Sequence, residues 1–245
     1  MHVTFSPLVL LVALAFLVPW ERFWTRLIGR RMLVEGRWIR RRLERELGAK
    51  ILVFTGAIER RHTFGLCRRI REVPVGRELI LVLDTRGGHS DGAFQVARCL
   101  AQHPGRVVVR VPDEAWSSGT VIACAADHVI LGPDANLGAA DIWADREPDR
   151  FYPARFLAAE RAGKSEDAVL AKELQDKAVE HVAAVRTLRG VPAEAAEATG
   201  LALCSFPDHV TALYQDQLRA FGLSVTVAED ARWSRLITCY SWSRL

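Results

Sequence analysis

The first residues of the chain form an uncharged, mostly apolar run from Val3 to Trp20. A helix rises about 1.5 Å per residue, so a helix over this run would span about 27 Å, close to the thickness of a bilayer core. Trp20 and Trp24 are typical of the aromatic belt at a membrane interface. A cleaved secretory signal is the alternative, but no basic residue precedes the run and no A-x-A cleavage site follows it. We therefore predict a retained, single-pass transmembrane anchor over residues 1–20.

A strongly basic stretch follows the apolar run. Residues 21–50 contain ten Arg and Lys and four Glu, a net charge of +6, whereas the whole chain carries +4. The positive-inside rule then predicts that everything after the anchor lies on the cytoplasmic side. We expect a basic juxtamembrane helix over residues 21–50, with membrane lipid contacted through residues 1–31 and anionic headgroups as its partners. A solvated connector helix is the alternative.

Short apolar runs alternate with amphipathic stretches in the middle of the chain. The run over residues 78–84 is almost continuously apolar, as expected for a strand that is buried on both faces of a parallel sheet. Strands are predicted over 51–55, 78–84, 106–111 and 128–131, and helices over 63–72, 91–102 and 117–126. This alternation predicts an α/β fold with right-handed βαβ crossovers and a mainly parallel sheet.

Beyond Trp143 the pattern becomes helical. Helices are predicted over 166–189, 192–199 and 207–221, with Gly200 capping the second, and a late strand is predicted over 223–227. We expect one domain over residues 51–230. The tail over 231–245 has no assigned structure, and the domain, the membrane and a partner are all open as its packing site.

The composition excludes several classes of function. The five cysteines are widely spaced without a CxxC pair, which favours free thiols over a disulfide framework or a zinc site. No P-loop, G-x-G-x-x-G or metal-ligand spacing occurs, so we expect neither a nucleotide cofactor nor a metal. The positive charge is local and is not spread over a folded face with interleaved aromatics, which argues against nucleic acid.

The ends of two predicted strands carry residues suited to catalysis. Gly87 and Gly88 follow one strand directly, and a glycine pair there allows backbone N–H groups to point at one spot, as in an oxyanion site. Ser117 follows the next strand at the start of a helix, where the helix dipole and the following N–H group favour a nucleophile. The same pattern also fits a serine that only caps its helix. The spacing leaves both interpretations open.

The segment over residues 79–142 carries an ordered series of short motifs. They are Thr85-Arg86-Gly87-Gly88, Ser117-Ser118-Gly119-Thr120, Ala125-Ala126-Asp127, Gly132-Pro133-Asp134 and Leu137-Gly138. This series closely resembles the serine dehydrogenase proteinase family, a branch of the Clp protease/crotonase superfamily that is related to signal peptide peptidase A. A looser resemblance extends over residues 21–227.

The resemblance implies a Clp protease/crotonase-like fold and a serine protease that acts on polypeptides through an acyl-enzyme. By the motif positions, Ser117 would be the nucleophile, and Gly88 and Ser118 would donate the oxyanion N–H groups. Gly87 and Trp116 would lie beside the substrate. Relatives with this fold self-assemble, so a homo-oligomer is also expected, and no cofactor is implied.

The sequence offers several candidates for the general base. Clp proteases use a Ser-His-Asp triad, but residues 141–143 stand where that histidine would be and contain none. The membrane-bound proteases of the family that the motifs resemble are thought to use a Ser-Lys dyad instead. A helical wheel places Leu170, Leu174, Lys177, His181 and Val185 on one stripe, with Lys172 opposite. Lys177 is therefore the favoured base, because partial burial lowers the pKa of a lysine. Lys164, His181, His89 or no base at all remain open.

Two functions of different class follow. The first is a membrane-anchored endopeptidase with a Ser117–Lys177 dyad, acting on membrane-associated or unfolded polypeptides. The second is a catalytically inactive scaffold on the same fold, because Arg86 replaces the proline of the family's T-P-G-G motif and Trp116 places a bulky ring before the serine. Acyl-CoA chemistry of the crotonase type uses the same oxyanion geometry and is a third possibility.

Overall fold

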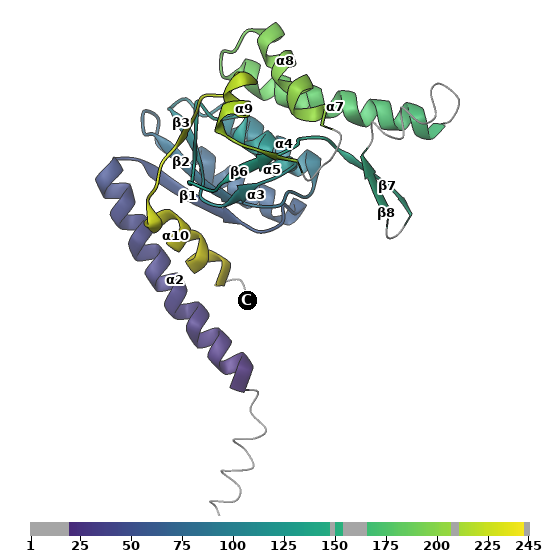
Figure 1. Cartoon of the computed structure of the whole chain (residues 1–245). Coiled ribbons are helices and arrows are strands. Elements are labelled where there is room, and N and C mark those ends of the chain that lie inside the picture. The colour runs from purple at the N-terminus through teal and green to yellow at the C-terminus, as the bar shows by residue number, and fades with distance from the viewer. Residues whose placement is uncertain (1–19, 148–149, 154–165, 207–210, 243–245) are drawn as a thin grey trace, which may run out of the picture.

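The computed structural model describes residues 20–147, 150–153, 166–206 and 211–242 (Figure 1). Its centre is a five-stranded sheet in the order β1-β2-β3-β5-β10, in which every neighbouring pair is parallel. The strands are β1 (Lys50–Thr55), β2 (Leu79–Asp84), β3 (Val107–Val111), β5 (His128–Leu131) and β10 (Val225–Val227). The predicted α/β fold with a mainly parallel sheet is confirmed.

Helices cover both faces of this sheet, which explains the continuous apolar runs of its strands. In β1, Leu52 and Phe54 point into one buried cluster while Ile51 and Val53 point into another. The first cluster lies under α3 (Arg60–Arg71), α4 (Ser90–Ala101), α5 (Ser118–Ala123), α7 (Glu166–Leu188), α8 (Ala193–Cys204) and α9 (Gln215–Ala220). The second lies under α2 (Trp20–Leu47) and α10 (Ala231–Trp242). The predicted basic helix is thus present as α2.

The C-terminal tail packs on the domain, which is one of the three sites left open by the sequence. Figure 1 shows α10 beside α2, and a Cβ added to Gly36 of α2 would lie 2.9 Å from the Cβ of Cys239. Trp233 of α10 is buried, and the guanidinium of Arg110 lies 4.6 Å from the centre of its ring. Cation–π contact and apolar burial therefore both hold the tail against the sheet.

Several short strands have no counterpart in the sequence prediction. The strands β4 (Glu114–Ala115), β6 (Asn136–Gly138) and β9 (Ala212–Leu213) form a small second sheet, and β7 (Trp143–Glu147) and β8 (Arg150–Pro153) form a hairpin that projects from the domain (Figure 1). The predicted helix over 207–221 is wrong in its described part before Gln215. Pairing of Leu213 with Leu137, both fully buried, draws that segment into a sheet.

The prediction that Gly200 ends a helix is also wrong. Gly200 lies inside α8, where an added Cβ would be only 2.8 Å from the carbonyl oxygen of Val179 in α7. The glycine is needed there because the two helices cross closely.

The predicted membrane anchor over residues 1–20 lies outside the described residues, apart from Trp20. Within the described ranges, none of the helices is both long and apolar enough to cross a membrane. The anchor therefore remains a prediction.

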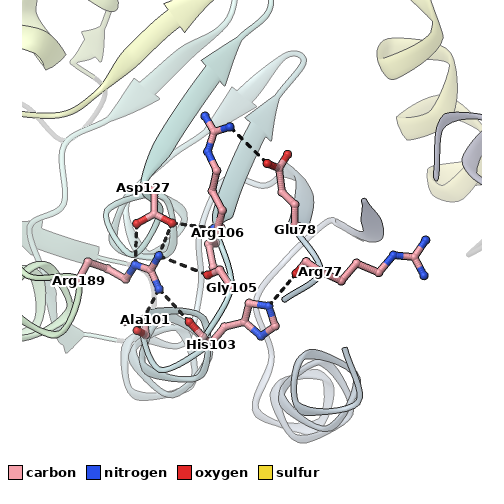
Figure 2. Close-up of polar contacts among 9 residues, drawn as sticks. Arg77, Glu78, Ala101, His103, Gly105, Arg106, Asp127 and Arg189 are labelled. Atoms are coloured by element: carbon pink, nitrogen blue, oxygen red, sulfur yellow. Dashed lines mark hydrogen bonds and ion pairs between the residues drawn. The ribbon is translucent and has the colours of Figure 1, made fainter. Parts of the chain in front are cut away.

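The end of α7 is fixed to the sheet by Arg189, which follows this helix directly (Figure 2). Its guanidinium donates to the Asp127 carboxylate, with 2.9 Å from Nε to Oδ1, and to the carbonyl oxygen of His103 at 2.9 Å. Asp127 in turn accepts from the backbone N–H of Val107 at 2.7 Å, at the start of β3. This network, the Arg189 clamp, joins α7 to the turns before β3 and β5 and so fixes where α7 lies over the sheet.

Replacing Arg189 by Met is expected to lower the free energy of unfolding by about 2–4 kcal/mol, because it leaves Asp127 and the carbonyl groups of three residues without their charged donor. Chemical denaturation measures the loss. Arg106→Met is the matched control, since the Arg106–Glu78 ion pair is 3.3 Å long and the Arg106 side chain is 60% exposed. That variant should change the free energy of unfolding by less than about 0.5 kcal/mol. Equal losses in the two variants would contradict the role given to the clamp.

Candidate active site

The two glycines and the serine singled out in the sequence meet at one edge of the main sheet. Neighbouring parallel strands end at the same edge, so the residues that follow β2 and β3 are brought together. The backbone N–H of Thr85 donates to the carbonyl oxygen of Glu114 at 3.0 Å, and the N–H of Trp116 donates to that of Thr85 at 2.9 Å. This bridge places the Gly87–Gly88 turn beside Ser117.

Ser117 has a strained backbone, with φ 53° and ψ −118°. Among the residues that the structure describes, it is the only one other than glycine with a positive φ. Such a conformation costs about 1–3 kcal/mol and is concentrated at functional sites. Ser117 stands at the N-cap position of α5, yet its side chain makes no capping hydrogen bond. The strain therefore presents the hydroxyl at the surface of a strand-to-helix turn, as in a nucleophile elbow.

Gly87 and Gly88 both lie in a backbone region that favours glycine, with φ +99° and +142°. A Cβ on Gly87 would lie 2.9 Å from the Cβ of Ser117, and one on Gly88 would lie 2.4 Å from the carbonyl oxygen of Ile58. No side chain fits at either position without moving the serine turn or the backbone beside it.

Two backbone N–H groups are free to bind an anion. The N–H groups of Ile58 and His89 are paired with carbonyls, at 2.9 and 2.8 Å, and Gly87 N–H donates to Thr85 Oγ1 at 3.0 Å. The N–H groups of Gly88 and Ser118 have no hydrogen-bond partner within the described part of the chain. The Ser118 hydroxyl also donates to the Gly88 carbonyl at 2.9 Å, which ties the two donors together.

A cavity of about 360 Å³ opens over these groups. Its described lining comes from both turns, from the segment after β6 and from α7: Arg86, Gly88, Ser90, Ser117, Ser118, Val121, Ala140, Asp141, Ile142, Ala178 and His181. The cavity thus brings together three of the predicted site residues, Ser117, Gly88 and Ser118. A serine hydroxyl and two unpaired backbone N–H groups around one space form an arrangement that can carry out acyl transfer.

Gly87 and Trp116, which the sequence placed beside the substrate, are not among the described residues that line this cavity. Trp116 donates from Nε1 to Asn136 Oδ1 at 2.7 Å, and its side chain covers Gly138, where an added Cβ would be 2.9 Å from the ring. Gly87 lies directly behind Ser117. Both residues shape the serine turn from within the protein.

The predicted base, Lys177, forms an ion pair with Asp91 at the start of α4, with 2.7 Å between Nζ and Oδ1. Its side chain is 42% exposed, and it is not part of the described cavity lining. The lysine hydrogen bond lowers the pKa of the Asp91 carboxyl. Only part of the stripe that the helical wheel predicted faces the protein interior. His181 and Val185 are buried, whereas Leu170 is exposed. His181, named in the sequence only as one alternative, is the α7 side chain with a titratable group in the cavity.

The sequence profile of ClpP-like SDH-type serine proteinases matches residues 8–188. The chain belongs to this family. The resemblance drawn from the motifs is confirmed, and it covers both turns of the site.

Two curated relatives of this chain come from Methanocaldococcus jannaschii. The uncharacterised protein MJ0137 is 35% identical over 120 residues, which is 48% of the chain and 41% of that protein. The uncharacterised protein MJ1495 is 34% identical over 76 residues, 31% of the chain and 26% of that protein. The chain therefore matches less than half the length of each.

Solved structures of the membrane-bound stomatin-specific protease 1510-N have a similar fold. A serine-to-alanine mutant of that protease superimposes with a TM-score of 0.52 at 17% identity, over 74% of the chain and 79% of that protein. A lysine-to-alanine mutant in complex with a substrate peptide gives 0.52 at 19%, over 74% of each. These likenesses show that the chain shares the fold of that protease.

The charge of Arg86 is engaged by a neighbouring carboxylate. Its Nε pairs with Glu114 Oε1 at 2.8 Å, and the side chain is 84% exposed. Behind it, burial first, and then the charges of Asp113 and Glu114, raise the pKa of Asp84 to about 6. The arginine thus partly neutralises an acidic strand end.

Among the residues that the structure describes, no group of three His, Cys, Asp or Glu side chains is arranged to hold a metal ion. All five cysteines are buried and free.

Replacing Ser117 by Gly is expected to give a more stable protein than replacing it by Ala, by about 1 kcal/mol, because glycine adopts the positive φ without strain. Thermal unfolding of the two variants measures the difference. Ser90 provides the control, since it is the first residue of α4, lines the same cavity and does not have a positive φ. There the order should reverse, with Gly less stable than Ala. The same order at both positions would show that the Ser117 turn is not strained.

Proposed function

We propose that this family member is a membrane-anchored serine endopeptidase that works through an acyl-enzyme on Ser117. The observation that carries the proposal is the strained Ser117 turn beside the unpaired N–H groups of Gly88 and Ser118. In such a reaction Ser117 Oγ attacks the peptide carbonyl, and the two N–H groups stabilise the negative charge that develops on its oxygen. The reacting bond would lie in the cavity above them.

The substrate class is inferred from the family and from a structural neighbour. The stomatin-specific protease is described as membrane-bound and was solved with a substrate peptide. By analogy we propose polypeptide substrates for this chain, membrane-associated or unfolded, and assembly into a homo-oligomer. The cavity is mixed in character, with Val121 and Ile142 beside Asp141 and Arg86, which suits a peptide better than a purely apolar ligand.

Membrane attachment in this proposal uses the predicted anchor and the helix that follows it. Trp24, Leu27, Val34 and Trp38 are exposed on α2, on the side turned away from the helix face that buries Ile39 and Leu43. Arginines flank these side chains, and aromatic and basic side chains together favour an interface with anionic headgroups. The domain would then lie at the cytoplasmic surface of the membrane.

The Ser-Lys dyad predicted from the sequence is one way to complete the site. Lys177 lies on α7, one turn before His181, which lines the cavity. To act as a base, the amine would have to leave Asp91 and lose its proton.

An inactive scaffold is the second candidate, favoured by one observation. In the described structure, the Ser117 hydroxyl has no hydrogen-bond partner that could take its proton. Catalytic hydrogen bonds often form only when substrate binds, so both candidates predict the same resting geometry and differ in reactivity.

A fluorophosphonate probe tests the two candidates directly. The wild-type chain should form a covalent adduct that peptide mass spectrometry places on Ser117, and Ser117→Ala should abolish it. Ser90→Ala is the matched control, because Ser90 lines the same cavity, and labelling should persist there. A folded wild-type protein that is not labelled would leave only the scaffold.

A further inference from the structure

We propose that a basic pocket between α2, the start of β1 and the end of α3 binds the phosphate group of a phosphomonoester. The pocket has a volume of about 350 Å³. Its described lining comes from these elements and from the turn after α3: Arg40, Lys50, Leu52, Arg69, Glu72, Val73, Pro74 and Arg77. Four of these side chains are cations and only one is a carboxylate.

The basic pocket lies at the opposite edge of the main sheet from Ser117. Lys50 is the first residue of β1, and Arg77 lies just before β2. The turns that carry Ser117 and Gly88 instead follow strand ends, and parallel neighbours all begin at one edge and end at the other. No described residue lines both cavities. Binding in the basic pocket is therefore separate from the peptide chemistry proposed above.

The cations of the basic pocket are only partly neutralised. Glu44 of α2 lies 3.1 Å from Lys50 Nζ and 3.9 Å from Arg40 Nη1, so one carboxylate serves two cations. Glu72 is shared with Arg68, which is not part of the described lining, with 3.7 Å between Nε and Oε1. Counting both carboxylates against the four lining cations still leaves two positive charges in excess.

Two guanidinium groups of the pocket have unused donors. Arg40 Nε is buried and has no hydrogen-bond partner within the described structure. Arg69 is partly buried, and its side chain forms neither an ion pair nor a hydrogen bond with any described residue. A charged donor that is removed from water without a partner costs free energy, which a bound anion would recover.

The two arginines also repel each other. Burial first, and then the charge of Arg40, lower the pKa of Arg69. Tyr240 and two carboxylates act in the opposite direction. An anion between the two guanidinium groups would turn this repulsion into attraction to a shared partner.

The turn that carries Arg77 is fixed without a ligand. Its N–H donates to the carbonyl oxygen of Pro74 at 3.1 Å, and its own carbonyl oxygen lies 3.3 Å from His103 Nε2 (Figure 2). Figure 2 shows the Arg77 side chain extending away from that contact, and its Nη2 donates to the carbonyl oxygen of Ala49 at 3.2 Å. Little ordering of this turn is then needed on binding, which reduces the entropic cost.

The charge and the donors fit a phosphomonoester best. Guanidinium groups match phosphate oxygens with paired hydrogen bonds. A phosphomonoester carries a charge of about −1.5 to −2 at pH 7 and three strong acceptor oxygens, which matches the excess of positive charge. A phosphodiester or a carboxylate carries one charge less. Leu52, Val73 and Pro74 add an apolar wall for the organic part of the ligand.

Thermal unfolding of the full chain, in a detergent that contains no phosphate, tests the proposal. At constant ionic strength, glycerol 1-phosphate should raise the unfolding temperature of the wild type in a saturable way, because it binds the folded state. Dimethyl phosphate, a diester, should raise it much less. Absence of a saturable rise with glycerol 1-phosphate, or an equal rise with dimethyl phosphate, would overturn the proposal.

Variants locate the binding site. Arg69→Met should weaken the apparent affinity for glycerol 1-phosphate about tenfold or more, because charged hydrogen bonds to the ligand are lost. Arg68→Met is the matched control, since this neighbouring arginine of α3 has a side chain that is 78% exposed. It should leave the affinity within about twofold, as expected for an exposed charge. Equal weakening in both variants would contradict binding in the pocket. If Arg69→Met fails to fold, Lys50→Met takes its place with the same expectation.

Reconstitution into bilayers identifies the source of the phosphate, because a soluble phosphomonoester and the headgroup of phosphatidic acid share this chemistry. If the headgroup occupies the pocket, phosphatidic acid added to phosphatidylcholine should stabilise the wild type and not Arg69→Met, and glycerol 1-phosphate should then add nothing. If the ligand is soluble, phosphatidic acid should act equally on both proteins, and the response to glycerol 1-phosphate should persist. Either result supports the pocket as a phosphate site. Loss of the wild-type response to glycerol 1-phosphate in phosphatidylcholine alone would contradict it.

Discussion

The contact between the Gly87–Gly88 turn and the Ser117 turn is the constraint on which the site depends. Both turns have backbone conformations that L side chains rarely adopt, and neither glycine position has room for a Cβ. The contact exists because β2 and β3 are parallel neighbours, so their following turns emerge at one edge. The main sheet, buried on both faces, supplies the stabilisation that offsets the strain of the serine turn.

The second requirement is a helix that closes one side of the cavity at the serine, and α7 provides it. The Arg189 clamp fixes one end of this helix, and the Lys177–Asp91 pair ties it to α4 nearer the cavity. Between these two attachments lies His181, stacked on Phe94. The charged groups of α7 thus hold the helix in place, while its buried His181 lines the cavity.

Much of this arrangement could be predicted from the sequence, and the reasons are local. Continuous apolar runs identified the parallel strands, and the two βα turns after neighbouring strands placed Gly88 near Ser117. The strands of the second sheet were missed because two or three residues, as in Ala212–Leu213, show no periodic pattern. The helix α10 has an amphipathic pattern of its own, through Trp233, Leu236 and Ile237, but its partner α2 is distant in sequence. On a helical wheel Lys177 and His181 share a stripe, and only the rotation of α7 against α4 decides which enters the cavity.

The most direct test of the account is a crystal structure of the chain after reaction with a fluorophosphonate. We predict phosphorus bonded to Ser117 Oγ, with its oxygen about 2.7–3.1 Å from the backbone nitrogens of both Gly88 and Ser118. An adduct on another residue, or an adduct on Ser117 whose oxygen points away from these two N–H groups, would contradict the claim that the two turns form a catalytic site.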